Sequence, residues 1–341
     1  MRKFKLQILL LVVLVSILYF LQTHIHTENE TETKPPADSD IIDISYDFSR
    51  DFTYQNYQHL TERILNFDKV TKIGKDQSGK YNMYMIELGN EDKPTLFVIA
   101  GMHGSEWQGT MYSMQFMEEL RDDTFPDKDL RNKLLNDYHI AYIPVVNPWG
   151  YDHTTLYKLE AGRYNSRGVD LNRDFDKFTQ AESRNVKRVM KRLKPFAFLD
   201  IHMMQSHYNG NRGNHIIIGN GQPQTNKIAS TIVHSLSKYA NQPVTRWDPP
   251  PKKHPLNEGL ARTYMRDQSN PYTPYTLSYI IELTKPVWRK NGLDMPLTNP
   301  KIMKYGMAGM YLFFLTSTKY YEEHHELSVL PDLNQITRYA S

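Results

Sequence analysis

The sequence predicts an α/β fold: a single domain in which helices flank a mixed, largely parallel central sheet. Short apolar runs with the length of buried strands alternate along the chain with longer segments that are typical of helices. Polar residues of the kind used in catalysis lie at the ends of several apolar runs. Ligands in such folds bind beyond the carboxyl ends of the strands, so we expect these polar residues to converge.

Composition sets outer limits on structure and function. With 341 residues, 40% of them hydrophobic, the chain can bury one large α/β core. The net charge of +3 and the lack of a basic, aromatic stripe predict no nucleic-acid binding. The absence of cysteine excludes disulfides, thiolate metal ligands and a lipid-modified cysteine.

The N-terminus has the pattern of a membrane anchor. Basic residues within the first five positions precede an almost entirely apolar run at 6–21. No small-residue cleavage site follows, so we expect an uncleaved signal anchor at 1–22 rather than a signal peptide. The basic start places the rest of the chain outside the cytoplasm, anchored to the membrane, or secreted if the segment is cleaved. A polar linker with two prolines follows at 23–40.

The expected globular domain covers 41–320, and a C-terminal tail covers 321–341. The expected helices lie at 53–67, 105–120, 179–193, 231–239 and 302–315. The expected strands lie at 81–88, 96–100, 138–146, 196–201, 215–219 and 279–283. The apolar stretch at 310–315 is too short to span a membrane, so we expect it to pack in the core.

A candidate metal-binding turn follows the apolar strand at 96–100. It contains His103 and Glu106, whose side chains can bind one divalent ion from a single short turn. Zinc suits nitrogen and oxygen ligands, and a catalytic zinc site typically has three protein ligands and an open position for water. Taken alone, the pair fits a metal-free helix cap as well as a metal site.

Two further strand residues could complete such a site. His202 ends the apolar strand at 196–201, and its place beside the other strand-end groups favours a metal ligand over a buried structural histidine. His207 is the alternative ligand. Glu282 lies within the apolar run at 279–283, where a charge is costly without a role or a partner. It is a candidate general base, and the alternative is a buried salt bridge.

The segment Gly168-Val169-Asp170-Leu171-Asn172-Arg173-Asp174-Phe175 resembles the Gly-Val-Asp-Leu-Asn-Arg-Asn-Phe motif of the zinc carboxypeptidase family, the funnelin metallocarboxypeptidases. Family motifs appear in order over residues 50–315: His103 with Glu106, Asn147-Pro148-Trp149-Gly150, Asn172 with Arg173, His202 and Glu282. The resemblance implies the zinc-carboxypeptidase fold and one zinc ion bound by His103, Glu106 and His202.

The resemblance also implies roles in catalysis. Glu282 would activate the water and pass its proton to the leaving amine. An arginine upstream of the Asn-Arg pair would polarise the scissile carbonyl. Arg163 has the best spacing for this role and Arg167 is the runner-up. Asp170 would orient a zinc-binding histidine, although a turn aspartate is the competing interpretation.

Substrate binding is implied in the same way. Asn172 and Arg173 would hold the terminal carboxylate, since an arginine fork matches a carboxylate with two parallel bonds. A tyrosine would cover the site, and Tyr264 is our choice among several tyrosines up to Tyr279. The chain departs from the family at Ser105, where familiar digestive members have an arginine. It departs again at Asp174, whose charge would repel an ordinary C-terminus or tune Arg173.

These observations predict a zinc metallocarboxypeptidase that removes C-terminal residues from peptides or peptidoglycan-derived stem peptides by a Glu-activated water. One alternative is a zinc-dependent deacylase of N-acyl amino acids, because relatives of that kind share the zinc site and a similar Asp-Leu-Asn-Arg segment. The other alternative is a non-catalytic peptide-binding module, against which the intact ligand set argues.

Overall fold

The computed structural model describes residues 41–158, 160–205, 214–218, 222–241, 243–247, 258–273, 275–295 and 297–329. These residues belong to one compact unit that begins at Ile41. The expected anchor and linker lie outside the described residues, as does His207. Within the described part of the chain, no helix is both long and apolar enough to cross a membrane.

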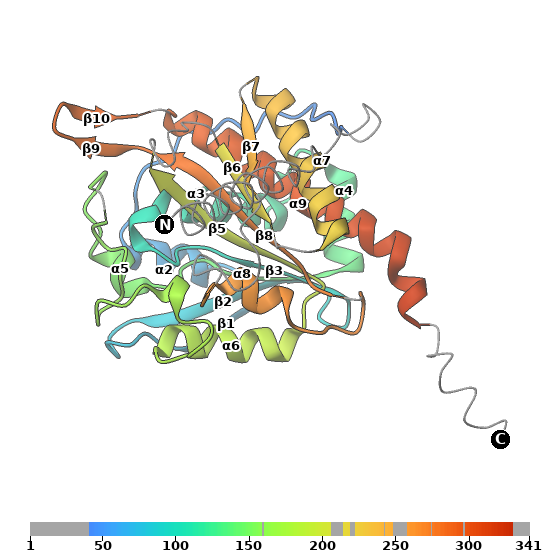
Figure 1. Ribbon diagram of the computed structural model, residues 1–341, viewed down its shortest axis with the longest axis horizontal. Coiled ribbons are helices and arrows are strands. Elements are labelled where there is room, and N and C mark those ends of the chain that lie inside the picture. The colour runs from blue at the N-terminus through green and yellow to red at the C-terminus, as the bar shows by residue number, and fades with distance from the viewer. Residues whose placement is uncertain are drawn as a thin grey trace, which may run out of the picture. The chain divides into compact units, whose positions relative to one another are not determined.

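An eight-stranded mixed sheet forms the centre of this unit, in the order β1-β2-β4-β3-β5-β8-β6-β7 (Figure 1). The four central strands run parallel: β4 (His139–Ile143), β3 (Thr95–Ile99), β5 (Ala197–Gln205) and β8 (Leu277–Lys285). The outer strands are β1 (Val70–Lys75), β2 (Asn82–Gly89), β6 (Asn214–Ile218) and β7 (Val244–Trp247). Antiparallel pairing joins β2 to β4 and β6 to β8, which confirms the predicted mixed, largely parallel sheet.

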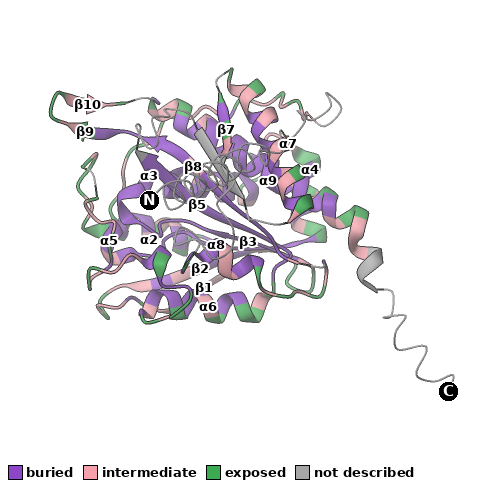
Figure 2. Cartoon of the chain, in the orientation of Figure 1, coloured by how far each residue is buried: buried purple, intermediate pink, exposed green. Residues whose placement is uncertain are grey.

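Helices pack on both faces of the sheet. The larger core includes buried residues of α2 (Tyr57–Leu65), α3 (Trp107–Arg121), α4 (Lys128–Asp137), α7 (Pro223–Ala240) and α9 (Asn299–Val329). The smaller core includes those of α6 (Ala181–Leu193) and α8 (Ala261–Arg266). Figure 2 shows the central strands buried between these layers.

The apolar run of β3 explains its central position. All of its residues are buried. Leu96 and Val98 join the larger core, whereas Phe97 and Ile99 join the smaller one. Successive side chains of a strand point to opposite faces, so a continuous apolar run suits a strand covered on both faces.

The long C-terminal helix α9 packs in the core, as expected. Phe314 stacks on Phe116 of α3, with ring centroids 5.4 Å apart. Phe313 meets Tyr279 of β8 at 5.9 Å. The helix is longer than predicted, because 321–329 of the expected tail continues it. Several elements were not predicted from the sequence: β1, β7, α4, α5 (Pro148–Asp152), α8 and the hairpin of β9 (Val287–Arg289) and β10 (Gly292–Asp294).

Candidate active site

The candidate metal-binding turn lies at the end of β3 and leads into α3. Gly104–Glu106 form a single 3₁₀ turn. A Cβ on Gly104 would lie 2.1 Å from the carbonyl carbon of Gly150, so only glycine fits here. The amide of Gly104 donates to the carbonyl of Gly162 at 2.9 Å. Tight packing against two other loops therefore fixes the turn.

The Asn-Pro-Trp-Gly motif builds one of those loops. It forms the short helix α5 (Pro148–Asp152) after β4. The buried Asn147 caps this helix, since its Oδ1 accepts from the Gly150 amide at 2.9 Å. Its Nδ2 donates to the carbonyl of Arg163 at 3.3 Å. Asn147 thus joins the motif to the segment that carries Arg163.

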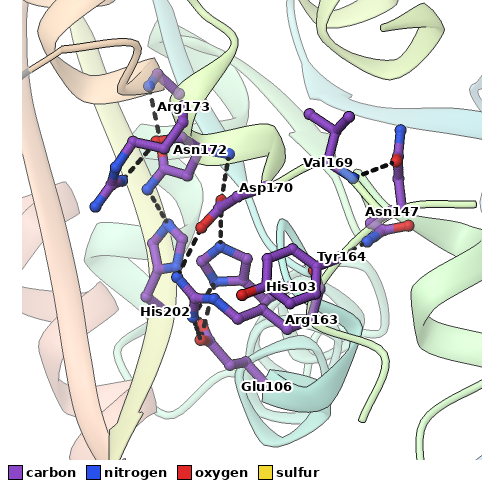
Figure 3. A network of polar contacts seen from close by, with 12 residues as sticks. His103, Glu106, Asn147, Arg163, Tyr164, Val169, Asp170, Asn172, Arg173 and His202 are labelled. Atoms are coloured by element: carbon purple, nitrogen blue, oxygen red, sulfur yellow. Dashed lines mark hydrogen bonds and ion pairs between the residues drawn. The ribbon is translucent and has the colours of Figure 1, made fainter. Parts of the chain in front are cut away.

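His103, Glu106 and His202 converge at the carboxyl end of the sheet (Figure 3). Each offers one ligand atom, and these atoms all lie within 4.8 Å of one another. His103 Nδ1 is 2.9 Å from Glu106 Oε1, and His202 Nδ1 is 3.0 Å from Glu106 Oε2. The three buried side chains could hold one metal ion. Such a set leaves a fourth tetrahedral position for water.

The Nε2 atoms of His103 and His202 each lie close to an aspartate. His103 Nε2 lies 3.0 Å from Asp170 Oδ1, which leaves Nδ1 to face the metal position. His202 Nε2 lies 3.1 Å from Asp200 Oδ2. The resemblance pointed to Asp170, but the sequence reading missed Asp200. The signal was present, because Asp200 is a charged residue within an apolar strand, as Glu282 is.

The charges of the site are strongly coupled. Burial opposes ionisation of Glu106, yet His103 and His202 hold the pKa of its carboxyl well below the usual value. Burial likewise disfavours the charged form of His202, but Asp200 and Glu106 raise its pKa well above the usual value. A metal ion held by these side chains would require both imidazoles to be neutral.

Glu282 faces the metal site from β8. It pairs in register with His202 of the neighbouring strand β5, and it is the one residue of β8 that is partly exposed. Burial raises the pKa of its carboxyl and Glu106 adds to the rise, whereas His202 opposes it. Among the side chains that the structure describes, none that is cationic lies within 4.0 Å of its carboxylate. A raised pKa suits a general base.

Of the two candidate arginines, Arg163 lies at the site. Its Nη2 is 2.9 Å from Asp170 Oδ2, and its Nη1 is 3.6 Å from Glu106 Oε1. Burial opposes its charge, but Glu106 and Asp170 raise its pKa. Arg167 is exposed on the turn that follows. The geometry therefore favours Arg163 for the role beside the metal.

Asn172 and Arg173 occupy different environments. Asn172 is buried; its Nδ2 lies 3.3 Å from His202 Nε2, and its Oδ1 accepts from the amide of Ala261 at 3.1 Å. The side-chain amide of Asn172 therefore links the start of α8 to His202. Arg173 is exposed and donates to the carbonyl of Asn172 at 2.7 Å. Arg173 is the better placed of the two to meet a substrate carboxylate.

Asp174 and Tyr264 have partners away from the metal ligands. Both carboxylate oxygens of Asp174 accept hydrogen bonds from residues 179–183 at the start of α6, so its charge is directed there rather than towards Arg173. Tyr264, on α8, packs its ring against Phe178 with centroids 5.0 Å apart. The role of Tyr264 as the covering tyrosine stays a prediction.

Lys285, the last residue of β8, brings a cation that the sequence reading missed. Its side chain is buried, and its Nζ lies 3.3 Å from Ser105 Oγ and 3.4 Å from the Ser105 carbonyl. Burial lowers the pKa of this ammonium, and Glu106 opposes the change. A basic side chain from β8 therefore lies beside Ser105. No local pattern around Lys285 indicates this long-range contact.

Comparison with known families decides the assignment. The model of the zinc carboxypeptidase family matches residues 53–282, which include all three candidate ligands and end at Glu282. The chain belongs to the zinc carboxypeptidase family. The resemblance seen in the motifs is thereby confirmed, and so is the expectation of a family that uses zinc.

Characterised relatives match over shorter stretches. The catalytic chain of carboxypeptidase N from Rattus norvegicus is 31% identical over 121 residues, covering 31% of this chain and 26% of that protein. Carboxypeptidase A6 from Mus musculus is 26% identical over 127 residues, covering 34% of this chain and 28% of that protein. The matched region thus spans only about a quarter of each relative's own length.

Solved structures show the same fold. A metallo-carboxypeptidase from Burkholderia cenocepacia superposes with a TM-score of 0.60 at 17% identity, covering 78% of this chain and 70% of that chain. One from Pseudomonas aeruginosa, in complex with (2-guanidinoethylmercapto)succinic acid, gives 0.59 at 21% identity, with 78% and 68% covered. At these low sequence identities, the structural similarity shows that the chain shares the fold of these proteins.

Proposed function

We propose that this protein is a zinc-dependent carboxypeptidase that hydrolyses the C-terminal bond of peptides. The convergence of side chains at one edge of the sheet carries the proposal. A three-residue metal site lies there, Glu282 is paired with one of the ligands, and the exposed Arg173 follows a residue that contacts the same ligand. Adjacent strands are about 4.8 Å apart, so Glu282 is close to the metal position.

Substrate binding rests on the exposed guanidinium of Arg173. It has the planar fork that binds a carboxylate with two parallel hydrogen bonds. The backbone of Arg173 is held in place by Gly259, where a Cβ would lie 2.4 Å from the Arg173 carbonyl. When Arg173 binds the terminal carboxylate of a peptide, the last amide bond of that peptide lies nearer to the metal ligands.

Zinc held by His103, Glu106 and His202 would lower the pKa of a bound water molecule to about 7 and would polarise a carbonyl. Glu282 accepts a proton from the attacking water as the new carbon–oxygen bond forms. It then delivers that proton to the amide nitrogen as the carbon–nitrogen bond breaks. Arg163, held by Asp170, stabilises the negative charge that develops on the carbonyl oxygen.

The location of the protein is a separate proposal that rests on the sequence of residues 1–22. An uncleaved anchor would place the catalytic unit outside the cytoplasm, where it meets scavenged peptides and, in a bacterium, wall stem peptides. Membrane fractionation and protease accessibility of whole cells test this. A cytoplasmic, protease-protected chain would contradict it.

The substrate class can be tested with the full chain. We would incubate it with mixed peptides, wall-derived muropeptides and N-acyl amino acids, with and without a chelator. Glu282→Gln is the test variant, and Glu62→Gln, an exposed glutamate on α2, is the control. We expect chelator-sensitive loss of C-terminal residues with the wild type and the control only.

Two results would contradict the proposal. Hydrolysis of N-acyl amino acids without any peptide shortening would assign the site to a deacylase. Tight, zinc-dependent peptide binding without hydrolysis of any substrate would assign it to a binding module. Trimming of muropeptides alone would keep the carboxypeptidase and restrict its substrate to wall peptides.

A further inference from the structure

The exposed side of α6 carries charge of one sign. Six basic residues lie on this helix and at its C-terminal end: Arg184, Lys187, Arg188, Lys191, Arg192 and Lys194. Five of them are exposed, and Lys187 is half-buried. Glu182, the only acidic residue of the helix, is fully buried. We call these six basic residues the basic face.

The basic face is regular because it follows the period of the helix. Arg184, Arg188 and Arg192 are four residues apart, so they form a row with a rise of about 6 Å between successive members. Lys187 and Lys191 repeat this spacing beside them. Like charges at this spacing repel one another. Within the described part of the chain, Arg192 is the only member of the face that forms an ion pair, so most of the repulsion is not compensated.

Each arginine of the row is held through one terminal nitrogen. Nη1 of Arg184 donates to the carbonyl of Phe178 at 3.1 Å, and Nη2 of Arg188 donates to the carbonyl of Ile73 in β1 at 3.2 Å. Nη2 of Arg192 lies 3.6 Å from a buried glutamate of β2. Among the described residues, these contacts orient the guanidinium groups and use only one terminal nitrogen of each. The other N–H groups can bind a phosphate, which accepts two parallel bonds from such a fork.

The row of arginines fits a ligand whose negative charges recur at intervals. A single phosphate would neutralise one guanidinium and leave the others in mutual repulsion. A polymer with a phosphate in every repeating unit can meet successive arginines and relieve the repulsion between them. The spacing along the helix therefore favours a linear polyanion over a small anion.

A lipid bilayer fits the basic face less well. Helices that lie at a membrane surface insert an apolar side among the lipid chains. The apolar residues of α6 already pack in the smaller core, and none of the large apolar side chains that are exposed in the described ranges lies on this helix. Figure 2 shows the exposed residues of α6 on the side that is turned away from the sheet.

Single-stranded nucleic acid also fits less well. Proteins that bind it combine a basic groove with aromatic side chains on which the bases stack. α6 contains no aromatic residue, and the ring of Phe178 beside it is covered by the ammonium of Lys187 at 3.7 Å from its centroid. The proposed location outside the cytoplasm likewise favours another kind of polymer.

We infer that the basic face binds a single-chain anionic polymer whose units are linked by phosphodiesters, of the poly(glycerol phosphate) kind. Binding depends on the charge of successive phosphates rather than on recognition of the units between them. It holds the catalytic unit at the polymer and leaves the metal site open, since no contact among the described residues joins the basic face to His103, Glu106 or His202. The inference does not depend on the proposed carboxypeptidase chemistry.

Binding of poly(glycerol phosphate) to the immobilised, zinc-loaded full chain tests the inference. We would measure the dissociation constant between about 50 and 200 mM salt, where the logarithm of the affinity should fall linearly with the logarithm of the salt concentration. Arg184→Gln/Arg188→Gln/Arg192→Gln should bind at least about tenfold more weakly at the lowest salt. Its salt slope should be smaller by about 2, as expected for three lost phosphate contacts with a single chain.

Lys227→Gln/Lys238→Gln/Lys319→Gln is the matched control. It changes the net charge by the same amount, but its three exposed lysines lie on α7 and α9, which pack in the larger core on the other face of the sheet. We expect it to keep the affinity and the salt slope of the wild type. Zinc content should be the same in all three proteins, which verifies that the variants are folded.

Lys191→Gln/Lys194→Gln provides a second test variant if the arginine variant folds poorly. Among the described residues, neither lysine makes a side-chain hydrogen bond or an ion pair, so the fold loses no contact. This variant should also weaken polymer binding, with a salt slope smaller by about 1.

Four outcomes would overturn the inference. The first is no binding of the polymer to the wild type at about 50 mM salt. The second is equal weakening in the lysine control, which would attribute binding to net charge alone. The third is tighter binding of phosphatidylglycerol vesicles than of the polymer at equal phosphate concentration, and the fourth is tighter binding of single-stranded DNA, each lost in the arginine variant. Failure of the proposed function, seen as the absence of peptide trimming, would leave all of these binding results unchanged.

Discussion

Asp170 contributes two contacts to the metal site from one carboxylate. Its Oδ1 lies 3.0 Å from His103 Nε2, and its Oδ2 accepts from Arg163 at 2.9 Å. Burial opposes its ionisation, but His103 and Arg163 hold the pKa of this carboxyl below its usual value. Asp170 therefore sets both the orientation of a ligand and the position of the arginine beside the metal.

Asp170→Asn should weaken zinc binding by about 10- to 100-fold, because an amide cannot provide two acceptor oxygens for His103 and Arg163. Competition with a chromophoric chelator measures the affinity. Asp176→Asn, an exposed aspartate in the same segment, should leave it unchanged. Equal zinc affinity in both variants would contradict the assignment of Asp170.

Asp174 stabilises the fold rather than the substrate site. Its carboxylate accepts from the amides of Thr179 and Gln180, each at 2.9 Å. Burial opposes ionisation, but these hydrogen bonds and those from hydroxyls lower its pKa. A depressed pKa in the folded state means that the stabilisation is present above the unfolded pKa of about 3.9 and is lost as the pH falls through the folded value.

Asp174→Asn should lower the free energy of unfolding at neutral pH by about 1–3 kcal/mol, because Nδ2 cannot accept hydrogen bonds. The difference in the free energy of unfolding between variant and wild type should become smaller as the pH falls below about 4, where the wild-type carboxyl becomes protonated. Denaturant unfolding at several pH values measures this. If this difference in the free energy of unfolding were the same at every pH, the Asp174 carboxylate would not be its cause.

At the scale of elements, three loops are held together by glycines. Gly104, Gly150 and Gly162 approach so closely that a Cβ on any of them would lie within 2.4 Å of another backbone or side-chain atom. The metal-binding turn, the Asn-Pro-Trp-Gly motif and the loop of Arg163 are therefore one packed unit. This explains why these motifs, which are far apart in the sequence, lie side by side in the structure.

Gly104→Ala should displace the metal-binding turn and reduce zinc affinity and activity together, by at least about tenfold. Gly168→Ala is the control: it adds a Cβ at a positive φ of 73°, but with no atom within 4 Å. The control should show only the local strain of that backbone conformation, seen as a small loss of stability. Normal zinc affinity in Gly104→Ala would show that the turn can shift without moving its ligands.

The central elements and the ligand set could be predicted because their signals are local. β3 and β8 are continuous apolar runs, and His103, Glu106 and Glu282 are polar residues at or near their carboxyl ends. Lys285 was missed, since its role depends on a contact with Ser105 that only the fold creates. Asp200, which contacts His202, was missed although a charged residue within an apolar strand is a local signal. The amide of Asn172 was assigned to substrate, but it contacts His202 and Ala261, which only the fold brings near.

At the scale of the whole molecule, metal binding and folding are linked. His103 follows β3, His202 lies within β5, and Glu106 contacts both histidines. An unfolded chain does not hold these groups together, so zinc binds the folded state and stabilises it.

Zinc should therefore raise the melting temperature of the wild type. At a free zinc concentration about a hundred times the dissociation constant, the free energy of unfolding rises by about 2.7 kcal/mol. His202→Ala removes a ligand and should abolish the zinc-dependent rise, whereas His153→Ala, an exposed histidine, should retain it. Thermal scans across a zinc titration provide the measurement. An equal rise in His202→Ala would place the bound metal elsewhere.

The measurement that tests the central claim most directly combines metal content with peptide trimming for the wild type and Glu282→Gln. Both proteins should bind one zinc ion per chain, because Glu282 is not among the three clustered ligands. Only the wild type should release C-terminal residues, as detected by mass spectrometry of the shortened peptides. Equal trimming by Glu282→Gln, or trimming by a wild type that holds no metal, would contradict the account.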